Sequence, residues 1–112
     1  MSIQLIEPDD VAKLILKHPE ILLIDVRERS DHASLRMAHS FCVPLAELGS
    51  DDFVNEHVTD PMRPILLICL LGKRANMAAQ TLQPRLKNPL FVLAGGLTAC
   101  REAGMALVEE TP

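Results

Sequence analysis

Short apolar runs alternate with segments of helical spacing along most of the chain. Four of these runs are rich in Ile, Leu and Val and predict strands: Ile3 to Ile6, Ile21 to Val26, Ile65 to Cys69 and Leu90 to Leu93. The third is the clearest, because it is continuous, apolar and bounded by Pro64 and Gly72. Strands that alternate with helical segments are typical of an α/β sheet.

Helical patterns separate these strands. Pro8 followed by two acids predicts a helix start for VAKLILKH. RERSDHASLR predicts one or two helical turns before an extended piece around Phe41, and LAELGSDDFVNEHV predicts a third, weak helix. Apolar positions at i, i+3, i+4 and i+7 predict a helix that begins at or just before Ala75, and LTACREAGMAL predicts a closing helix ended by Gly104.

Composition narrows the class of protein. A chain of 112 residues with 48% hydrophobic content predicts one domain over residues 1–112. A net charge of −4 and an aromatic content of 3% argue against nucleic acid as a partner. The chain has no apolar run of membrane length, and MSIQLIEPDD is acidic where a secretion signal is basic, so we expect a cytoplasmic protein with no membrane partner. Its three cysteines lack metal-site spacing, so we expect reduced thiols, no metal and no cofactor.

The stretch ILLICLLGKR carries the candidate chemistry. It places Cys69 at the carboxyl end of a strand, where open α/β sheets hold their ligand sites. The following helix start presents unpaired N–H groups, and Lys73 and Arg74 add two positive charges, which favour a thiolate or a bound anion. Gly72 supplies the backbone freedom that a tight turn needs. The alternative interpretation is a buried core thiol, the commoner fate of a cysteine that ends an apolar strand.

Four segments together resemble the rhodanese-like domains. They are LLIDVRE (22–28), DHASLRMAHSFCVPL (31–45), CLLGKR (69–74) and LAGGLTACREAG (93–104), in the order and spacing of the family's motifs. The resemblance covers nearly the whole chain. It implies a three-layer fold, in which helices cover both faces of a mostly parallel central sheet.

The resemblance also implies sulfur transfer. The Cys69 thiolate would attack a sulfane sulfur of a small anionic donor such as thiosulfate, form a persulfide, and pass the outer sulfur to cyanide, a thiol or a protein acceptor. Leu70, Leu71, Gly72 and Lys73 would bind the substrate mainly through main-chain amides, and Arg74 would orient an anionic donor through its planar fork.

Some positions depart from the family pattern. Leu70, Leu71 and Ala75 stand where the family often has polar side chains, which predicts a drier site that is less selective for thiosulfate. Arg36 lies in a loop that departs from the family pattern. It is either a substitute cation that binds the substrate or a solvated surface residue. Two other function classes stay open: a non-catalytic rhodanese-like interaction module, and a cysteine phosphatase or arsenate reductase on the same architecture. No acid between Pro64 and Phe91 is available for phosphatase chemistry.

The remaining polar candidates have structural interpretations. Asp25 and Arg27 flank a strand end and predict a structural pair or a cap, with contact to the active-site loop as the alternative. Cys100 is expected to pack in the core, and Cys42 to be buried unless it resolves a Cys69 persulfide. The four histidines have no metal-site spacing.

Overall fold

The computed structural model describes residues 3–110, so the expected domain range of 1–112 extends past it at both ends. Five strands form one sheet in the order β1-β6-β5-β2-β4, and all four neighbouring pairs are parallel. The bounds are β1 Ile3–Ile6, β2 Leu22–Asp25, β4 Phe41–Cys42, β5 Ile65–Ile68 and β6 Leu90–Leu93. The predicted strands are confirmed, with ends that differ by a residue, and β1 lies at an edge as expected.

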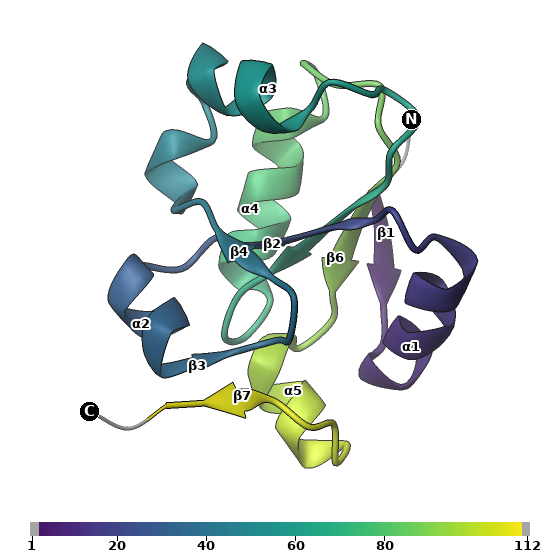
Figure 1. The fold of residues 1–112 in the computed structure, drawn as a ribbon, viewed down its shortest axis with the longest axis vertical. Coiled ribbons are helices and arrows are strands. Elements are labelled where there is room, and N and C mark those ends of the chain that lie inside the picture. The colour runs from purple at the N-terminus through teal and green to yellow at the C-terminus, as the bar shows by residue number, and fades with distance from the viewer. Residues whose placement is uncertain (1–2, 111–112) are drawn as a thin grey trace.

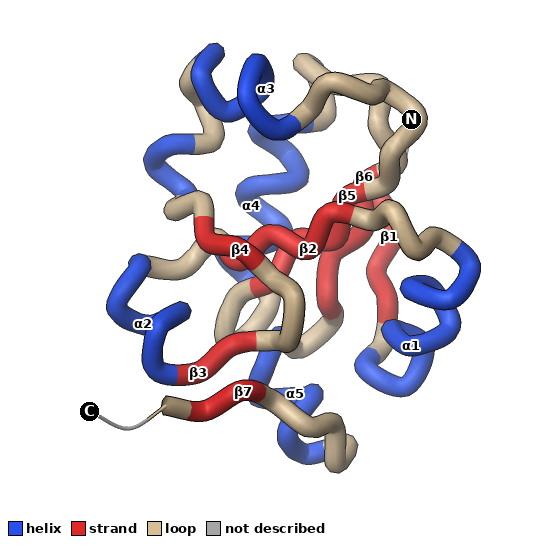
Figure 2. The backbone as a smooth tube through the Cα atoms, viewed as in Figure 1, coloured by secondary structure: helices blue, strands red, loops and turns tan. Residues whose placement is uncertain are grey.

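Helices cover both faces of this sheet, which confirms the predicted fold class. Figure 2 shows the strands as a central band, with α3 (Asp51–His57) and α4 (Lys73–Leu82) on one side and α1 (Pro8–Lys17) and α5 (Gly96–Glu102) on the other. The side chains of β5 alternate between these two layers, because Ile65 and Leu67 pack with α3 and α4 whereas Leu66 and Ile68 pack with α1 and α5.

The helix starts follow the local sequence. In α1, Pro8 stands at the first helical position, where its missing N–H is not needed, and Val11 and Leu14 turn inward. Ser50 caps α3 by accepting a hydrogen bond from the Phe53 N–H. The predicted turns after β2 form α2 (Arg29–Ser34), and a short 3₁₀ helix, Leu45–Glu47, precedes α3. Among the described residues, none of the helices is long and apolar enough to cross a membrane.

A second, small sheet was not predicted from the sequence. Its strands, β3 (Leu35–Arg36) and β7 (Val108–Glu109), are antiparallel, and Figure 1 shows both of them below β4. The Glu110 N–H extends the pairing by donating to the Ser34 carbonyl at 2.8 Å. Strands of two residues have no periodicity to detect, so only the tertiary structure reveals this pairing.

Candidate active site

The site lies where two adjacent strands end. Asp25 of β2 is in register with Ile68 of β5, and the Val26 N–H donates to the Ile68 carbonyl at 2.9 Å. The segments that follow these strands therefore emerge side by side at the carboxyl edge of the sheet. One segment carries Cys69 into α4, and the other carries Arg27 into α2.

Cys69 lies at the N-terminus of α4, as predicted. Its sulfur accepts hydrogen bonds from the main-chain N–H groups of Gly72 at 3.0 Å and Ala75 at 3.3 Å. These are donors that the first turn of a helix leaves without a partner, so the sulfur acts as a cap for α4. The positive end of the helix dipole and the two N–H groups stabilise negative charge on this atom. The sulfur therefore has two hydrogen-bond donors, and Cys69 is at the same time part of the buried core on the α3 and α4 side of the sheet.

The loop from Cys69 to Arg74 is held in place by the start of α5. The N–H groups of Leu97 and Thr98 donate to the carbonyls of Cys69 and Leu70 at 2.9 and 3.0 Å. In a trans peptide the N–H points opposite to the C=O, so the next two amides, those of Leu70 and Leu71, point away from α5. Among the described residues, these two N–H groups have no hydrogen-bond acceptor.

Two glycines make this close approach possible. A Cβ at Gly96 would lie 2.4 Å from the Leu70 carbonyl carbon and oxygen and 2.5 Å from the Cys69 oxygen. Gly72 turns the chain into α4 with φ of 98°, in the left-handed region that side chains disfavour. The sequence predicted the role of Gly72. Gly95 and Gly96 form the turn from β6 into α5, and the contact of this turn with the cysteine loop was not predicted.

A cavity of about 380 Å³ opens beside Cys69. Four further residues of the loop line it: Leu70, Leu71, Lys73 and Arg74. The structure thus brings these predicted loop residues together around the cysteine. Cys69 itself is 2% exposed, whereas Leu70 and Leu71 are 46% and 66% exposed. Two more residues, Arg27 and Asp31, line the cavity from outside this loop.

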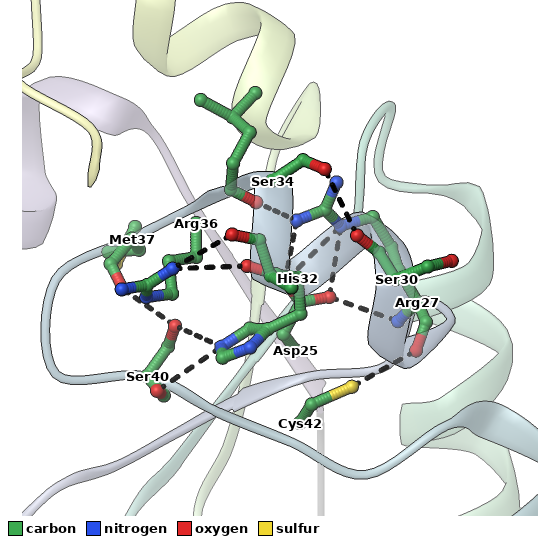
Figure 3. A network of polar contacts seen from close by, with 11 residues as sticks. Asp25, Arg27, Ser30, His32, Ser34, Arg36, Met37, Ser40 and Cys42 are labelled. Atoms are coloured by element: carbon green, nitrogen blue, oxygen red, sulfur yellow. Dashed lines mark hydrogen bonds and ion pairs between the residues drawn. The ribbon is translucent and has the colours of Figure 1, made fainter. Parts of the chain in front are cut away.

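Arg27 forms a structural pair with Asp25 and also lines the cavity beside Cys69. Its main-chain N–H donates to the Asp25 carboxylate at 3.0 Å, and its Nε and Nη2 donate to the same carboxylate at 2.9 to 3.2 Å. Figure 3 shows this pair, in which Nη2 also donates to the Leu35 carbonyl. Asp25 is fully buried, so the pair is structural, as predicted. The same arginine also forms part of the cavity wall.

Asp31 was missed as a site residue. It lies on α2, far in sequence from the cysteine loop, and its exposed side chain reaches the cavity. Asp31 lies outside the range from Pro64 to Phe91, which contains no acid. A polar residue shortly after a buried strand was the only signal in the sequence.

Arg36 does not join the site. It is absent from the lining of the cavity, and its guanidinium contacts the Glu110 carboxylate at 3.0 Å and the carbonyl of Ala33 at 3.2 Å. Arg36 is therefore neither at the cysteine nor freely solvated, because its guanidinium links β3 to Glu110, the residue that follows β7.

The other two cysteines are unlike Cys69. Burial raises the pKa of Cys100, which is fully buried as expected. Burial and, to a lesser extent, the charge of Asp25 raise the pKa of Cys42, whose thiol donates to the Arg27 carbonyl at 3.2 Å. Cys42 lines a separate cavity of about 500 Å³, while Cys69 lines the first one. In residues 3–110, no group of three or more His, Cys, Asp or Glu could hold a metal ion.

Comparison with known proteins identifies the family. The chain matches the family described as Rhodanese-like domain over residues 7–103. It is 29% identical, over 106 residues, to a Drosophila persimilis protein named adenylyltransferase and sulfurtransferase MOCS3. That match covers 87% of this chain and 24% of the relative, so this chain spans about a quarter of the relative's length. The chain belongs to the rhodanese-like domain family.

Solved structures agree on the fold. The thiosulfate sulfurtransferase of Pseudomonas aeruginosa matches with a TM-score of 0.86 at 23% identity, over 97% of this chain and 21% of the other. A Rhodopseudomonas palustris protein of unknown function, described as a possible tyrosine phosphatase, matches with a TM-score of 0.75 at 22% identity, over 95% and 85% of the two chains. The rhodanese-like fold is thereby confirmed.

Proposed function

We propose that this domain is a sulfurtransferase that carries sulfane sulfur as a persulfide on Cys69. The observation that carries the proposal is the position of the Cys69 sulfur, which accepts two main-chain N–H groups at the N-terminus of α4. A sulfur held in this way is ready to act as a nucleophile without a neighbouring base. Two similar proteins, MOCS3 of Drosophila persimilis and the thiosulfate sulfurtransferase of Pseudomonas aeruginosa, are named as sulfurtransferases, which supports the same chemistry.

In the first step, the Cys69 thiolate attacks the outer sulfur of the donor. A new S–S bond forms while the donor's own S–S bond breaks, and the electron pair of that bond leaves with the donor. With thiosulfate, the products are the Cys69 persulfide anion and sulfite. In the second step, an acceptor thiolate or cyanide attacks the outer sulfur and releases the Cys69 thiolate, so no external oxidant or reductant is needed.

The loop provides the groups that this chemistry requires. The amides of Leu70 and Leu71 point away from α5 and lack a partner among the described residues, so they are donors for the terminal sulfur of the persulfide. Lys73 and Arg74 line the cavity and attract an anionic donor, and Arg74 can bind two oxygens with its fork. Reduced thiols are needed throughout, which suits a cytoplasmic location.

Intact-mass measurement after treatment with thiosulfate tests the proposal. We expect one added sulfur atom on the wild-type protein and none on Cys69→Ser. Cys42→Ser and Cys100→Ser are the matched controls and should keep the adduct, because raised pKa values leave both thiols protonated at neutral pH. An adduct that maps to Cys42 or Cys100 would show that the proposed nucleophile is wrong.

One observation favours a second candidate, a cysteine phosphatase. Asp31 supplies the cavity with a carboxylate, which a phosphatase needs near the leaving oxygen. Against it, the six-residue loop from Cys69 to Arg74 is short for an oxyanion with three oxygens around the point of attack. Hydrolysis of an aryl phosphate that is faster than sulfur transfer, and lost in both Cys69→Ser and Asp31→Asn, would replace the sulfurtransferase proposal. Inactivity in both assays would favour a non-catalytic interaction module.

A further inference from the structure

We propose that the physiological sulfur donor or acceptor at Cys69 is an organic thiol or persulfide with an apolar chain and at most one negative charge. This inference rests on the proposed sulfur transfer and names its substrate class. Two independent features of the cavity support it: the apolar surface of its loop and the balance of its charges.

The apolar feature is the exposure of two leucines beside the nucleophile. Leu70 and Leu71 are 46% and 66% exposed, although they follow Cys69 directly and line its cavity. A dianion gains nothing from these side chains, whereas an aliphatic chain laid over them removes apolar surface from water on both partners. The cavity of about 380 Å³ lies within the usual range for small organic ligands, which is roughly 300–1,000 Å³.

The second feature is the charge balance of the lining. Lys73 and Arg74 are the two cations of the cavity without an ion pair in residues 3–110. Arg27 is also cationic, but the buried Asp25 carboxylate already offsets its charge. Asp31 adds a negative charge, and its carboxylate has no partner among residues 3–110.

The nucleophile itself completes this balance. Once the proposed Cys69 thiolate is counted, the two cations face two anions, so Lys73 and Arg74 attract a dianion such as thiosulfate less strongly than they would without Asp31. A neutral or singly charged thiol depends less on a net positive charge in the cavity.

The chemical step with such a substrate balances without any co-reactant. In the loading direction, the Cys69 thiolate attacks the outer sulfur of R–S–SH, and the S–S bond of the substrate breaks. The leaving thiolate takes the proton of the outer sulfur, which yields RSH and the Cys69 persulfide anion. In the unloading direction, the sulfur of RSH attacks the outer sulfur of the persulfide, and the S–S bond to Cys69 breaks. The proton of the thiol moves to the transferred sulfur, which yields R–S–SH and the Cys69 thiolate.

The experiment measures unloading of a preformed persulfide, so that the choice of substrate is separated from the ability to carry sulfur. The full chain is loaded with inorganic polysulfide, and peptide mass mapping locates the added sulfur on Cys69. The rate of sulfur loss is then measured with ethanethiol, 1-butanethiol and 1-hexanethiol. We expect the rate constant to rise about tenfold from the shortest to the longest thiol, because the added methylenes cover Leu70 and Leu71.

Matched variants assign this preference to the leucines. In Leu70→Ser/Leu71→Ser, the rate should become nearly independent of chain length. In Leu16→Ser, which removes an 82% exposed leucine on α1, the preference should stay as in the wild-type protein. A wild-type rate that is independent of chain length, or an equal preference in both variants, would overturn the inference while the Cys69 persulfide still supports sulfur transfer. Failure of every sulfane sulfur source to load Cys69 would overturn both.

The charge feature is tested with mercaptosuccinate, which has two carboxylates, and 3-mercaptopropionate, which has one. The wild-type protein should react several-fold more slowly with the dicarboxylate, and Asp31→Asn should reduce this difference. Asp9→Asn, an exposed acid in the first turn of α1, is the control and should leave the difference unchanged. No change in Asp31→Asn would show that Asp31 plays no part in selection, which contradicts the proposed charge balance.

Discussion

Two arginines that are both candidates for anion binding lie in different surroundings. Arg74 lines the cavity beside Cys69 and has no ion pair in the described part of the chain. Arg36 contacts Glu110 and two main-chain carbonyls away from that cavity. Location therefore distinguishes two side chains of identical chemistry, and only Arg74 lines the cavity beside Cys69.

This difference predicts the effects of two alanine substitutions on persulfide formation with thiosulfate. Arg74→Ala removes a fork that forms charge-assisted hydrogen bonds, so the rate should fall about tenfold. Arg36→Ala breaks a surface ion pair and should change the rate by less than about twofold. Mass spectrometry of samples quenched at a series of times measures the rate of persulfide formation in both variants. An equal loss in the two variants would indicate that the rate depends on the net charge of the molecule rather than on the position of the arginine.

At the scale of elements, the cysteine loop depends on two helices with different tasks. The first turn of α4 donates the Ala75 N–H to the Cys69 sulfur, while the first turn of α5 holds the Cys69 and Leu70 carbonyls. The Cys69 sulfur is thus bound to α4, and the loop that carries it is bound to α5.

The contact with α5 predicts a specific effect of Gly96→Ala. The new Cβ would lie 2.4 Å from the main chain of Leu70, so the loop must move. A displacement of about 1 Å at a reacting group can cost a hundredfold in rate, and we expect a loss of that order in persulfide formation. Overpacking should also lower the free energy of unfolding by about 1–3 kcal/mol beyond the backbone strain.

Gly104→Ala is the matched control for this prediction. Gly104 has φ of 82°, and a Cβ added there would meet nothing within 4 Å, so alanine brings strain without a clash. It should lower stability by about 1–2 kcal/mol and leave persulfide formation unchanged. Urea denaturation and the mass assay measure the two effects, and equal rates in both variants would show that the α5 contact does not position the loop.

At the scale of the whole molecule, the core consists of two apolar clusters, one on each face of the sheet. Cys69 packs with the α3 and α4 layer, and Cys100 with the α1 and α5 layer. Cys42 is half-buried in the edge strand β4. The burial of the latter two thiols links global stability to pH.

The raised pKa values of Cys42 and Cys100 predict a loss of stability in mild alkali. The unfolded thiols lose their protons near pH 8.5, before the folded ones, so the unfolded state binds fewer protons and gains relative stability as the pH rises. The stabilisation is therefore complete below about pH 8 and falls above about pH 9. The chain has no tyrosine, which removes one competing titration.

Urea denaturation across this pH range checks the prediction. The double variant Cys42→Ala/Cys100→Ala should show a shallower decline than the wild-type protein above about pH 8.5. The double variant is less stable at neutral pH because it loses packing, so each protein is compared with its own free energy of unfolding at neutral pH. Parallel curves for the two proteins would show that other groups cause the decline.

The sequence by itself determined the parts of this protein that depend on local pattern. Continuous apolar runs marked the main strands, helical spacing marked α1 and α4, and the residues from Cys69 to Arg74 marked a candidate nucleophile at a helix start. Each of these features depends on neighbours in the chain. The tertiary structure decided what the sheet brings together from distant segments: Arg27 and Asp31 in the cavity wall, Gly96 against the Cys69 loop, and Glu110 on Arg36. No local pattern encodes these contacts, because parallel strand order and helix packing set which distant residues meet.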